Sequence, residues 1–407
     1  MVKSLYIHIP FCNQICSYCD FPKVFSCGQD VDAYLTALIA ELTVYEKTVG
    51  FAELETVYIG GGTPTILTIE QLDNLFTYLH SAINFHNLSE VSIEANPESL
   101  SDPQKIACLK RNGVTRISLG VQTFQKSHLQ ILERSHTKEE ASEVINLLSK
   151  ESFEINLDMI YGIPTQTLRD WENDLDILLQ LPITHVSAYS LILEEHTKFY
   201  IDYMKDELEL VDNEIEAQMF EMAIDKLIAA GFEHYEISNF TKSKQSTHNM
   251  TYWKNKYYIG VGLGAHGHIM GTPEVEKALK SDNTNDCKCN LNIAREIVNR
   301  NSIRYENTRS IIAYKKALET GELPVLNFHA LTRDEQIEES MFLGMRLLEG
   351  VNLDHLQAKY DVDIYELYKP KLNKLRDQGY VSLESGVLRL TRKGIMMANN
   401  VFEEFLL

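Results

Sequence analysis

Residues 10–21 read Pro-Phe-Cys-Asn-Gln-Ile-Cys-Ser-Tyr-Cys-Asp-Phe and place Cys12, Cys16 and Cys19 on one short loop. Three thiolates at this spacing can wrap an iron–sulfur cubane and ligate three of its four irons. The fourth iron then has no protein ligand and can bind a chelating small molecule. A zinc site with His8 as fourth ligand is the alternative, but structural zinc sites usually draw their ligands from two separated pairs. The motif therefore predicts a redox iron–sulfur cluster.

The cysteine loop follows the first of several short apolar runs that alternate with segments of helical period. The runs that read as strands are Leu5–Ile9, Thr56–Ile59, Glu90–Glu94, Thr115–Gly120, Glu154–Ile160 and His185–Leu191. The segments that read as helices are Asp32–Tyr45, Ile69–Ile83, Pro103–Asn112, Lys138–Lys150 and Trp171–Leu181. Such alternation predicts parallel βα units with right-handed crossovers, in a full or partial barrel or an open sheet. The chemistry of these folds lies at the C-terminal ends of the strands.

The character of the sequence changes after a long predicted helix, Val211–Ala230. The last part contains amphipathic helices, a hairpin signal around Glu384-Ser-Gly and a closing helix, Arg392–Phe405, in a layout that is winged-helix-like. We predict three parts: a core at 1–235, a connecting region at 236–330 with a polar insertion near 270–303, and a C-terminal domain at 331–407.

The composition predicts an ordinary globular protein with an acidic surface. The chain has 407 residues and a formal net charge of -20, so nucleic-acid binding is not expected. No apolar run reaches the roughly 18 residues of a membrane span, and the N-terminus lacks the apolar region of a signal peptide. Seven cysteines, three of them clustered, favour metal ligation in a reducing compartment over disulfides. We therefore expect a cytoplasmic protein without an integral membrane segment.

The cysteine motif and several further words resemble the radical S-adenosylmethionine (SAM) superfamily. These words are Tyr-Ile-His-Ile-Pro-Phe-Cys at Tyr6–Cys12, Gly60-Gly-Gly-Thr-Pro-Thr, Glu94-Ala-Asn-Pro-Glu, Gly120-Val-Gln-Thr-Phe and Leu157-Asp-Met-Ile-Tyr-Gly-Ile-Pro-Thr-Gln-Thr. They are most similar to the branch of oxygen-independent coproporphyrinogen III dehydrogenases (HemN) and the related HemW haem chaperones. The resemblance implies a partial (β/α)6 barrel of the TIM type with a C-terminal helical domain. It also implies that SAM chelates the open iron of a [4Fe-4S] cluster.

The resemblance assigns a set of residues to the SAM pocket. They are Tyr6, Gly61, Gly62, Thr63, Glu94, Gln122, Arg134 and Asp158. The glycine run permits close approach of the backbone to a ligand, although a tight βα turn is the alternative. Without the resemblance, Arg134 is a solvated helix charge, Asp158 a buried cap and Tyr6 a core aromatic residue.

Three features favour the chaperone over the dehydrogenase. Cys19 is followed by Asp20-Phe21-Pro22 where the dehydrogenases usually have another cysteine, and the cluster motif begins at residue 12, without their N-terminal extension. His248-Asn-Met-Thr-Tyr-Trp fits H-N-x-x-Y-W, a word that resembles the HemW haem-binding motif. Imidazole is a natural axial ligand of haem iron, and Tyr252 and Trp253 can pack on a porphyrin face. A structural histidine that fixes its loop by hydrogen bonds is the alternative.

Two further features stay open at the sequence level. His266, in Gly260-Val-Gly-Leu-Gly-Ala-His-Gly, is a second candidate for contact with haem. Cys287 and Cys289 in the polar insertion can bind a soft metal or assist redox chemistry, but a pair of loop thiols without function is the simpler interpretation.

The expected function is that of a haem chaperone with three cofactors: a [4Fe-4S] cluster, SAM and haem. The expected partners are haem-acceptor proteins and an electron donor such as a flavodoxin or ferredoxin. The alternatives are oxidative decarboxylation of coproporphyrinogen III and a related radical SAM reaction. Coproporphyrinogen dehydrogenase activity is not expected, no catalytic residue is assigned, and whether the protein is an enzyme stays open.

Overall fold

The six apolar runs form six neighbouring parallel strands in the computed structural model, which describes residues 1–279 and 302–407. The strands are β1 (Ser4–Ile9), β4 (Thr56–Gly61), β5 (Glu90–Ala95), β6 (Arg116–Gln122), β7 (Glu154–Tyr161) and β8 (His185–Ser190). They pair in this order along the sheet, all in parallel. The predicted six-stranded α/β core is therefore confirmed. The pair Cys287 and Cys289 lies outside the described residues.

The sheet continues beyond both edges of this core to twelve strands, an extension that the sequence did not predict. The added strands are β11 (Tyr258–Val261), β12 (His266–Met270), β13 (Ser302–Asn307) and β14 (Val325–Leu331) beyond β1, and β10 (Asn239–Thr241) and β9 (Glu233–Glu236) beyond β8. β11 is parallel to β1, and the remaining added strands are antiparallel to their neighbours. Most of them are short, and β11 and β12 contain glycine, which weakens the strand signal in a sequence.

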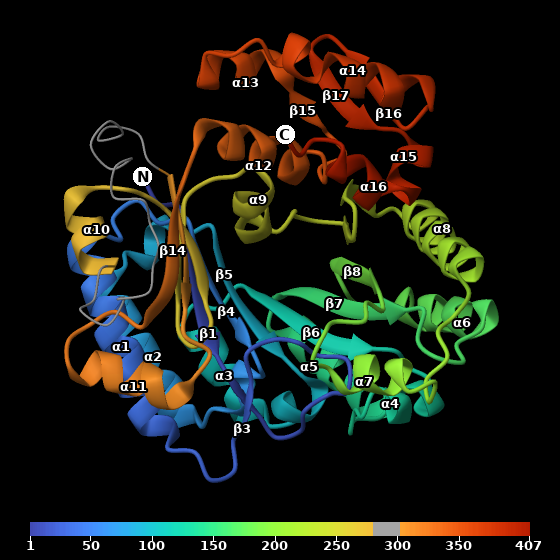
Figure 1. The fold of residues 1–407 in the computed structure, drawn as a ribbon. Helices are drawn as coiled ribbons and strands as arrows, with labels where there is room; N and C mark the ends of the chain where they lie inside the picture. Colours follow the sequence, from blue (N-terminus) through green and yellow to red (C-terminus); the bar gives the residue numbers. More distant parts are fainter. Residues whose placement is uncertain (280–301) are drawn as a thin grey trace.

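Helices cover the outer face of the curved sheet (Figure 1). They are α1 (Val31–Thr48), α2 (Ile69–Ala82), α3 (Pro103–Arg111), α5 (Lys138–Lys150), α6 (Leu168–Leu178), α8 (Asn213–Ala229), α10 (Pro273–Leu279) and α11 (Ile311–Glu319). Two short helices, α4 (Lys126–Ile131) and α7 (Lys198–Met204), instead pack near the cysteine loop, where Ile131 and Phe199 share a small apolar cluster with Tyr18. α6 begins at Leu168, earlier than the predicted Trp171, because Thr167 and Asp170 form a capping box that satisfies the first amides of the helix.

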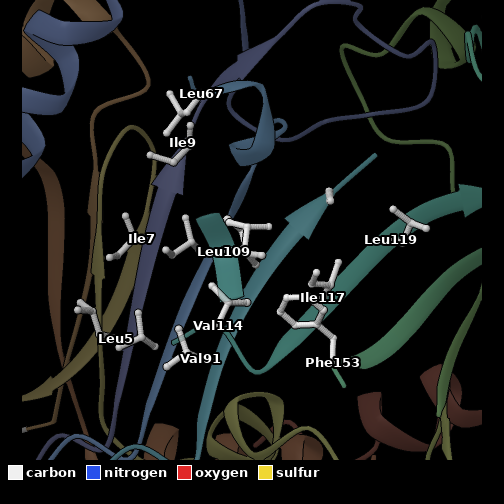
Figure 2. Packing of buried hydrophobic residues seen from close by; sticks show 14 of the residues in the cluster. Leu5, Ile7, Ile9, Leu67, Val91, Leu109, Val114, Ile117, Leu119 and Phe153 are labelled. Atoms are coloured by element: carbon white, nitrogen blue, oxygen red, sulfur yellow. The ribbon is translucent and has the colours of Figure 1, made fainter. Parts of the chain in front are cut away.

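The core lies between the strands and these helices. On β1, Leu5, Ile7 and Ile9 are fully buried, and Figure 2 shows them in one cluster with Val91 of β5 and Leu109 of α3. Burial of one such side chain contributes about 1.5–3 kcal/mol. The alternate residues of the same strand, Tyr6 and His8, point to the concave face. Because strand side chains alternate, the outer face supplies stability and the concave face is available for polar groups.

The C-terminal region has a hydrophobic core of its own. Its elements are α12 (Arg333–Gly344), β15 (Val351–Asn352), α13 (Leu353–Tyr360), α14 (Ile364–Asp377), β16 (Val381–Glu384), β17 (Val387–Leu390), α15 (Arg392–Met396) and α16 (Ala398–Glu403). The predicted hairpin is confirmed: β16 and β17 are joined by Ser385 and Gly386, both with positive φ, which suits a two-residue turn. The predicted closing helix is wrong in one respect, because it divides at Met397 into α15 and α16. In the described part of the chain, no helix combines the length and the apolar character that a bilayer span requires.

Candidate functional site

The three cysteines lie on the loop between β1 and α1, at the C-terminal end of the parallel strands. The loop is held by two short paired strands, β2 (Phe11–Cys12) and β3 (Val24–Phe25). All three thiols are free and line one cavity of about 390 Å³. The predicted cluster ligands are therefore on the wall of the same cavity.

The glycine run brings the end of β4 against the cysteine loop. The amide of Gly62 donates to the carbonyl oxygen of Ile9 at 2.9 Å, and that of Thr63 donates to Phe11 at 2.9 Å. A Cβ atom on Gly62 would lie 2.8 Å from the sulfur of Cys12. Any larger residue at this position would displace the cysteine, so the close approach requires glycine. Gly61, Gly62 and Thr63 all line the cavity.

Glu94 lies at the end of β5 with its carboxylate on the cavity wall. Its Oε1 accepts from the hydroxyl of Tyr58 at 2.8 Å, and its Oε2 accepts from the amide of Gly61 at 2.8 Å. Burial raises the pKa of Glu94 to about 7, although both hydrogen bonds act in the opposite direction. A buried carboxylate beside a cavity is a favourable partner for a cationic group of a ligand.

Arg134 follows α4 and extends across the cavity toward the cysteines. Its Nη1 lies 3.5 Å from the sulfur of Cys16, and its Nη2 donates to Asn96 Oδ1 at 2.6 Å and to the carbonyl oxygen of Gly120. Its buried Nε has no hydrogen-bond partner among the residues that the structure describes. Arg134 is thus no solvated helix charge, because it joins the cysteine loop to the ends of two strands. It keeps a donor that a bound molecule can satisfy.

The deeper wall of the cavity is polar. Gln122, at the end of β6, has a positive φ of 67° and lines the cavity together with Asp158 of β7. Asp158 accepts from Ser118 at 2.9 Å and from Asn156 at 2.8 Å. Burial raises the pKa of Asp158, and these hydrogen bonds oppose the rise.

Sequence reasoning missed several residues of this cavity. Among them are Tyr58, Asn96, Arg116, Ser118, Asn156, Ser187 and Asn249. For the residues within strands, a signal was available. Tyr58, Ser118 and Asn156 lie on the same face of the sheet as the predicted Glu94 and Asp158, because side chains alternate between the two faces along each strand. In a parallel barrel, polar residues that alternate with buried apolar ones mark the inner face.

The residues present fit a cluster with one open iron. Burial raises the pKa of Cys12 to about 11 and also raises that of Cys19, so metal binding must displace these protons. Within the described residues, no group of three histidine, cysteine or acidic side chains converges on a single metal ion. The three thiols line one cavity, and in a cubane each cysteine binds a different iron.

The H-N-x-x-Y-W word forms α9 (Thr247–Trp253), a helix that closes the opposite, N-terminal end of the strands (Figure 1). His248 is 0% exposed. Its Nδ1 is hydrogen-bonded to Thr56 Oγ1 at 2.8 Å, and its Nε2 to the hydroxyl of Tyr252 at 2.8 Å. Its ring stacks on Tyr58, the residue that donates to Glu94. The geometry connects His248 to the main cavity through Tyr58, with both ring nitrogens engaged.

Three other residues singled out from the sequence lie around a second cavity, of about 310 Å³, along the neighbouring strands β1, β11 and β12. Tyr6, Tyr252 and His266 line it. Tyr6 does not line the main cavity; its hydroxyl is bonded to His8 Nδ1 at 2.9 Å and its ring stacks on Tyr58. Tyr58 therefore separates Tyr6 from the cysteines.

Comparison with known proteins assigns the chain to a family. The model of the radical SAM superfamily matches residues 6–178, and the model of the HemN C-terminal domain matches residues 331–397. The heme chaperone HemW of Lactococcus lactis is 38% identical, covering 100% of this chain and 97% of the relative. The heme chaperone HemW of Bacillus subtilis is 38% identical, covering 100% of this chain and 99% of the relative. The heme chaperone HemW of Mycobacterium tuberculosis is 31% identical, covering 99% of this chain and 94% of the relative.

A solved structure has the same fold. The coproporphyrinogen III oxidase HemN from Escherichia coli, described as a radical SAM enzyme, superposes with a TM-score of 0.79 over 100% of this chain and 90% of that chain. At 21% identity this likeness concerns the fold alone. The fold, the cysteine cavity and the full-length sequence similarity agree: the chain belongs to the radical SAM superfamily and, within it, to the family of the HemW heme chaperones.

Proposed function

We propose that this protein is a haem chaperone, which binds haem and a SAM-ligated [4Fe-4S] cluster and transfers haem to acceptor proteins. The observation that carries the proposal is the similarity, over the whole chain, to relatives named heme chaperone HemW. The cavity supports it, because the three thiols, the glycine run and Glu94 line one space.

In this proposal, Cys12, Cys16 and Cys19 would hold the cluster. When bound, the cluster supplies a one-electron redox centre with an open iron, to which SAM is the ligand. Arg134 lies beside Cys16, with its Nη1 at 3.5 Å from the sulfur, and its Nε, which has no partner among the described residues, can donate to an acceptor on a bound molecule. Glu94 and Asp158 supply acceptors on the same wall.

We further propose that His248 serves haem binding by positioning a neighbour. Its hydrogen bond to Tyr252 fixes a ring that faces the second cavity. Acceptor proteins, an electron donor such as a flavodoxin or ferredoxin, and a cytoplasmic location belong to the same proposal. They rest on the family membership and on the reduced thiols that a cluster requires.

The proposal is tested with anaerobically reconstituted protein in two parallel assays. In the first, haem is titrated and followed by its Soret absorbance. In the second, coproporphyrinogen III is supplied with SAM and a reductant. Stable haem binding without decarboxylation is expected. Formation of protoporphyrinogen would overturn the chaperone assignment in favour of the dehydrogenase.

The cluster ligands are tested by Cys16→Ser, with Cys27→Ser as the matched control. Cys27 is an exposed free thiol on the same loop. We expect the Cys16 variant to lose most of its iron and its cluster absorbance after reconstitution, because a cubane needs all three thiolates. Cys27→Ser should load as the parent protein does. Equal loading of both variants would remove Cys16 from the ligand set.

A further inference from the structure

We propose that haem binds in the second cavity, with His266 as axial ligand and Arg309 as partner of a propionate. This inference rests on the proposed haem-chaperone function and names the site for that function. The cavity, of about 310 Å³, lies between the cysteine loop and β11 and β12. The six residues that carry the inference are Tyr6, Phe21, Tyr252, Tyr258, His266 and Arg309.

His266 has the accessibility that an axial ligand requires. It is the first residue of β12, and its side chain is 56% exposed. Its Nε2 lies 3.7 Å from a carboxylate oxygen of Glu306, beyond the range of a strong hydrogen bond. Partial burial and the nearby cations Arg309 and Arg304 lower the pKa of His266, while Glu306 acts in the opposite direction.

His248 lacks this accessibility. It is 0% exposed, and its two ring nitrogens are bonded to Thr56 and Tyr252. Direct ligation of iron would break one of these buried hydrogen bonds and would open α9 from the strands. Loss of a buried hydrogen bond that leaves its partner unsatisfied costs about 1–3 kcal/mol. The two histidines therefore have different tasks: His248 holds the cavity wall and His266 faces the cavity.

The wall that His248 holds is aromatic. The rings of Tyr252 and Tyr258 form an edge-to-face pair with centroids 4.6 Å apart. On the other side, Phe21 of the cysteine loop is 56% exposed, which is unusual for so large an apolar residue. A planar tetrapyrrole can cover such rings and remove their apolar area from water.

Arg309 adds a charge complementary to a haem propionate. It is exposed, and no ion pair joins it to another described residue. Its side chain passes beside Gly264, two residues before His266. A guanidinium group matches a carboxylate with two parallel hydrogen bonds. An imidazole, an aromatic wall and a guanidinium around one cavity thus match the three chemical parts of haem.

The second cavity is in contact with the cluster loop. Asp20 and Phe21, directly after Cys19, line both cavities. The carbonyl oxygen of Pro22 is hydrogen-bonded to His8 Nε2 at 2.7 Å. A haem in this cavity would touch the loop that carries the cluster ligands, so occupancy of one site can affect the other through Asp20 and Phe21.

The test uses the full-length reconstituted protein, titrated with ferric haem and examined by absorbance and electron paramagnetic resonance. His266→Ala should weaken haem binding by about tenfold or more and abolish the histidine-ligated spectrum, since even changes beside a metal ligand cost about 10–100-fold. Free imidazole should restore that spectrum. Arg309→Gln should weaken binding by about three- to tenfold while leaving the spectrum intact, because the iron ligand remains.

The matched control is His329→Ala. His329 is also on an antiparallel strand, is 59% exposed and lies 2.9 Å from the carboxylate of Glu335, but it does not line the second cavity. This variant should bind haem as the parent does. Unchanged affinity and spectrum in His266→Ala would overturn the inference while leaving the chaperone function intact. Loss of the axial signal in His248→Ala, with the cluster loaded and the signal kept in His266→Ala, would also overturn it. Failure of the parent protein to bind haem would instead refute the proposed function.

Discussion

Two buried glutamates show how similar residues acquire different roles. Burial raises the pKa of both Glu41 and Glu94 to about 7. Glu94 faces the main cavity. Glu41 of α1 lies in the interior, where it accepts from the Gly262 amide at 2.9 Å, from Asn307 Nδ2 at 2.6 Å and from the Tyr314 hydroxyl at 2.5 Å. A perturbed pKa indicates a functional site only where a cavity accompanies it.

The role of Glu41 predicts a pH-dependent stability. Its carboxyl group holds its proton more tightly in the folded state, with a pKa of about 7 against an ordinary 4.5, so the free energy of unfolding falls as pH rises through this interval. The difference between these two pKa values corresponds to a loss of about 3 kcal/mol in the free energy of unfolding. The free energy of unfolding, measured by urea denaturation, should fall less between about pH 5 and about pH 8 in Glu41→Gln than in the parent protein.

The comparison of the two proteins isolates Glu41, because Glu94 and the other buried acids remain in both. A decline of equal size in the variant and the parent would show that Glu41 does not titrate in this range. Asn307 donates to both Glu41 and the Gly262 carbonyl, so some loss of stability in Glu41→Gln at every pH is compatible with the prediction.

At the scale of elements, the cysteine loop depends on a glycine in a distant loop. Gly264, between β11 and β12, has a φ of +63°, and a Cβ atom there would lie 2.4 Å from Cγ of Pro22. The amide of Gly264 donates to the carbonyl oxygen of Thr308 at 2.9 Å, which fixes its place. Pro22 follows the cluster motif by three residues, and its ring cannot rotate away. The contact sets the distance between the cysteine loop and the second cavity.

Gly264→Ala should therefore disturb the cysteine loop. We expect a free energy of unfolding about 1–3 kcal/mol lower than in the control variant, as is usual for an overpacked contact, and a reduced iron content after reconstitution. The control is Gly231→Ala, because Gly231 also has a positive φ, +87°, but has open space around it. It reports the backbone strain alone. Equal iron contents in the two variants would show that the contact with Pro22 does not support the loop.

At the scale of the whole molecule, α9 lies between the barrel and the C-terminal region. Arg346, which follows α12, stacks on the ring of Trp253 at 4.3 Å and lies 3.6 Å from the buried carboxylate of Glu236 on β9. The amide of Ile237 donates to the carbonyl oxygen of Arg346 at 3.1 Å. One arginine thus contacts the end of the H-N-x-x-Y-W word, the edge of the large sheet and the C-terminal region. The boundaries at 235 and 330 stay predictions, and these contacts all cross the one at 330.

Arg346→Met should destabilise the protein by about 1–3 kcal/mol, because it leaves the carboxylate of Glu236 buried without a cation. Adding Glu236→Gln should recover most of that loss, which denaturation of the two single variants and the double variant can measure. The control is Lys254→Met. Lys254 pairs with Glu349 at 2.9 Å on the surface, with side chains 41% and 59% exposed, and its loss should cost less than about 1 kcal/mol. Additive effects at Arg346 and Glu236 would show that the two residues do not interact.

Much of the fold and of the main cavity could be predicted from the sequence. The period of the apolar residues identified the six parallel strands, because one face of each strand must be buried against helices. The spacing of the cysteines indicated the cluster, since three ligands on one loop are a local property of the chain. Gly62 and Glu94 were assigned to one pocket by the resemblance to the radical SAM superfamily, and their places at the C-terminal ends of parallel strands, which meet at one edge, agree with that assignment.

Only the tertiary structure decided the roles of residues whose partners are distant in the sequence. The sequence could not show that β11 to β14 and β9 to β10 extend the sheet, because short strands depend on their neighbours for hydrogen bonds. It presented His248 as the first candidate for contact with haem and His266 as a second one. The fold separates them: His248 lies in the interior between Thr56 and Tyr252, while His266 lies beside an open cavity. Burial and hydrogen-bond partners are properties of the packed chain, and for a histidine they determine whether its nitrogens can reach a ligand.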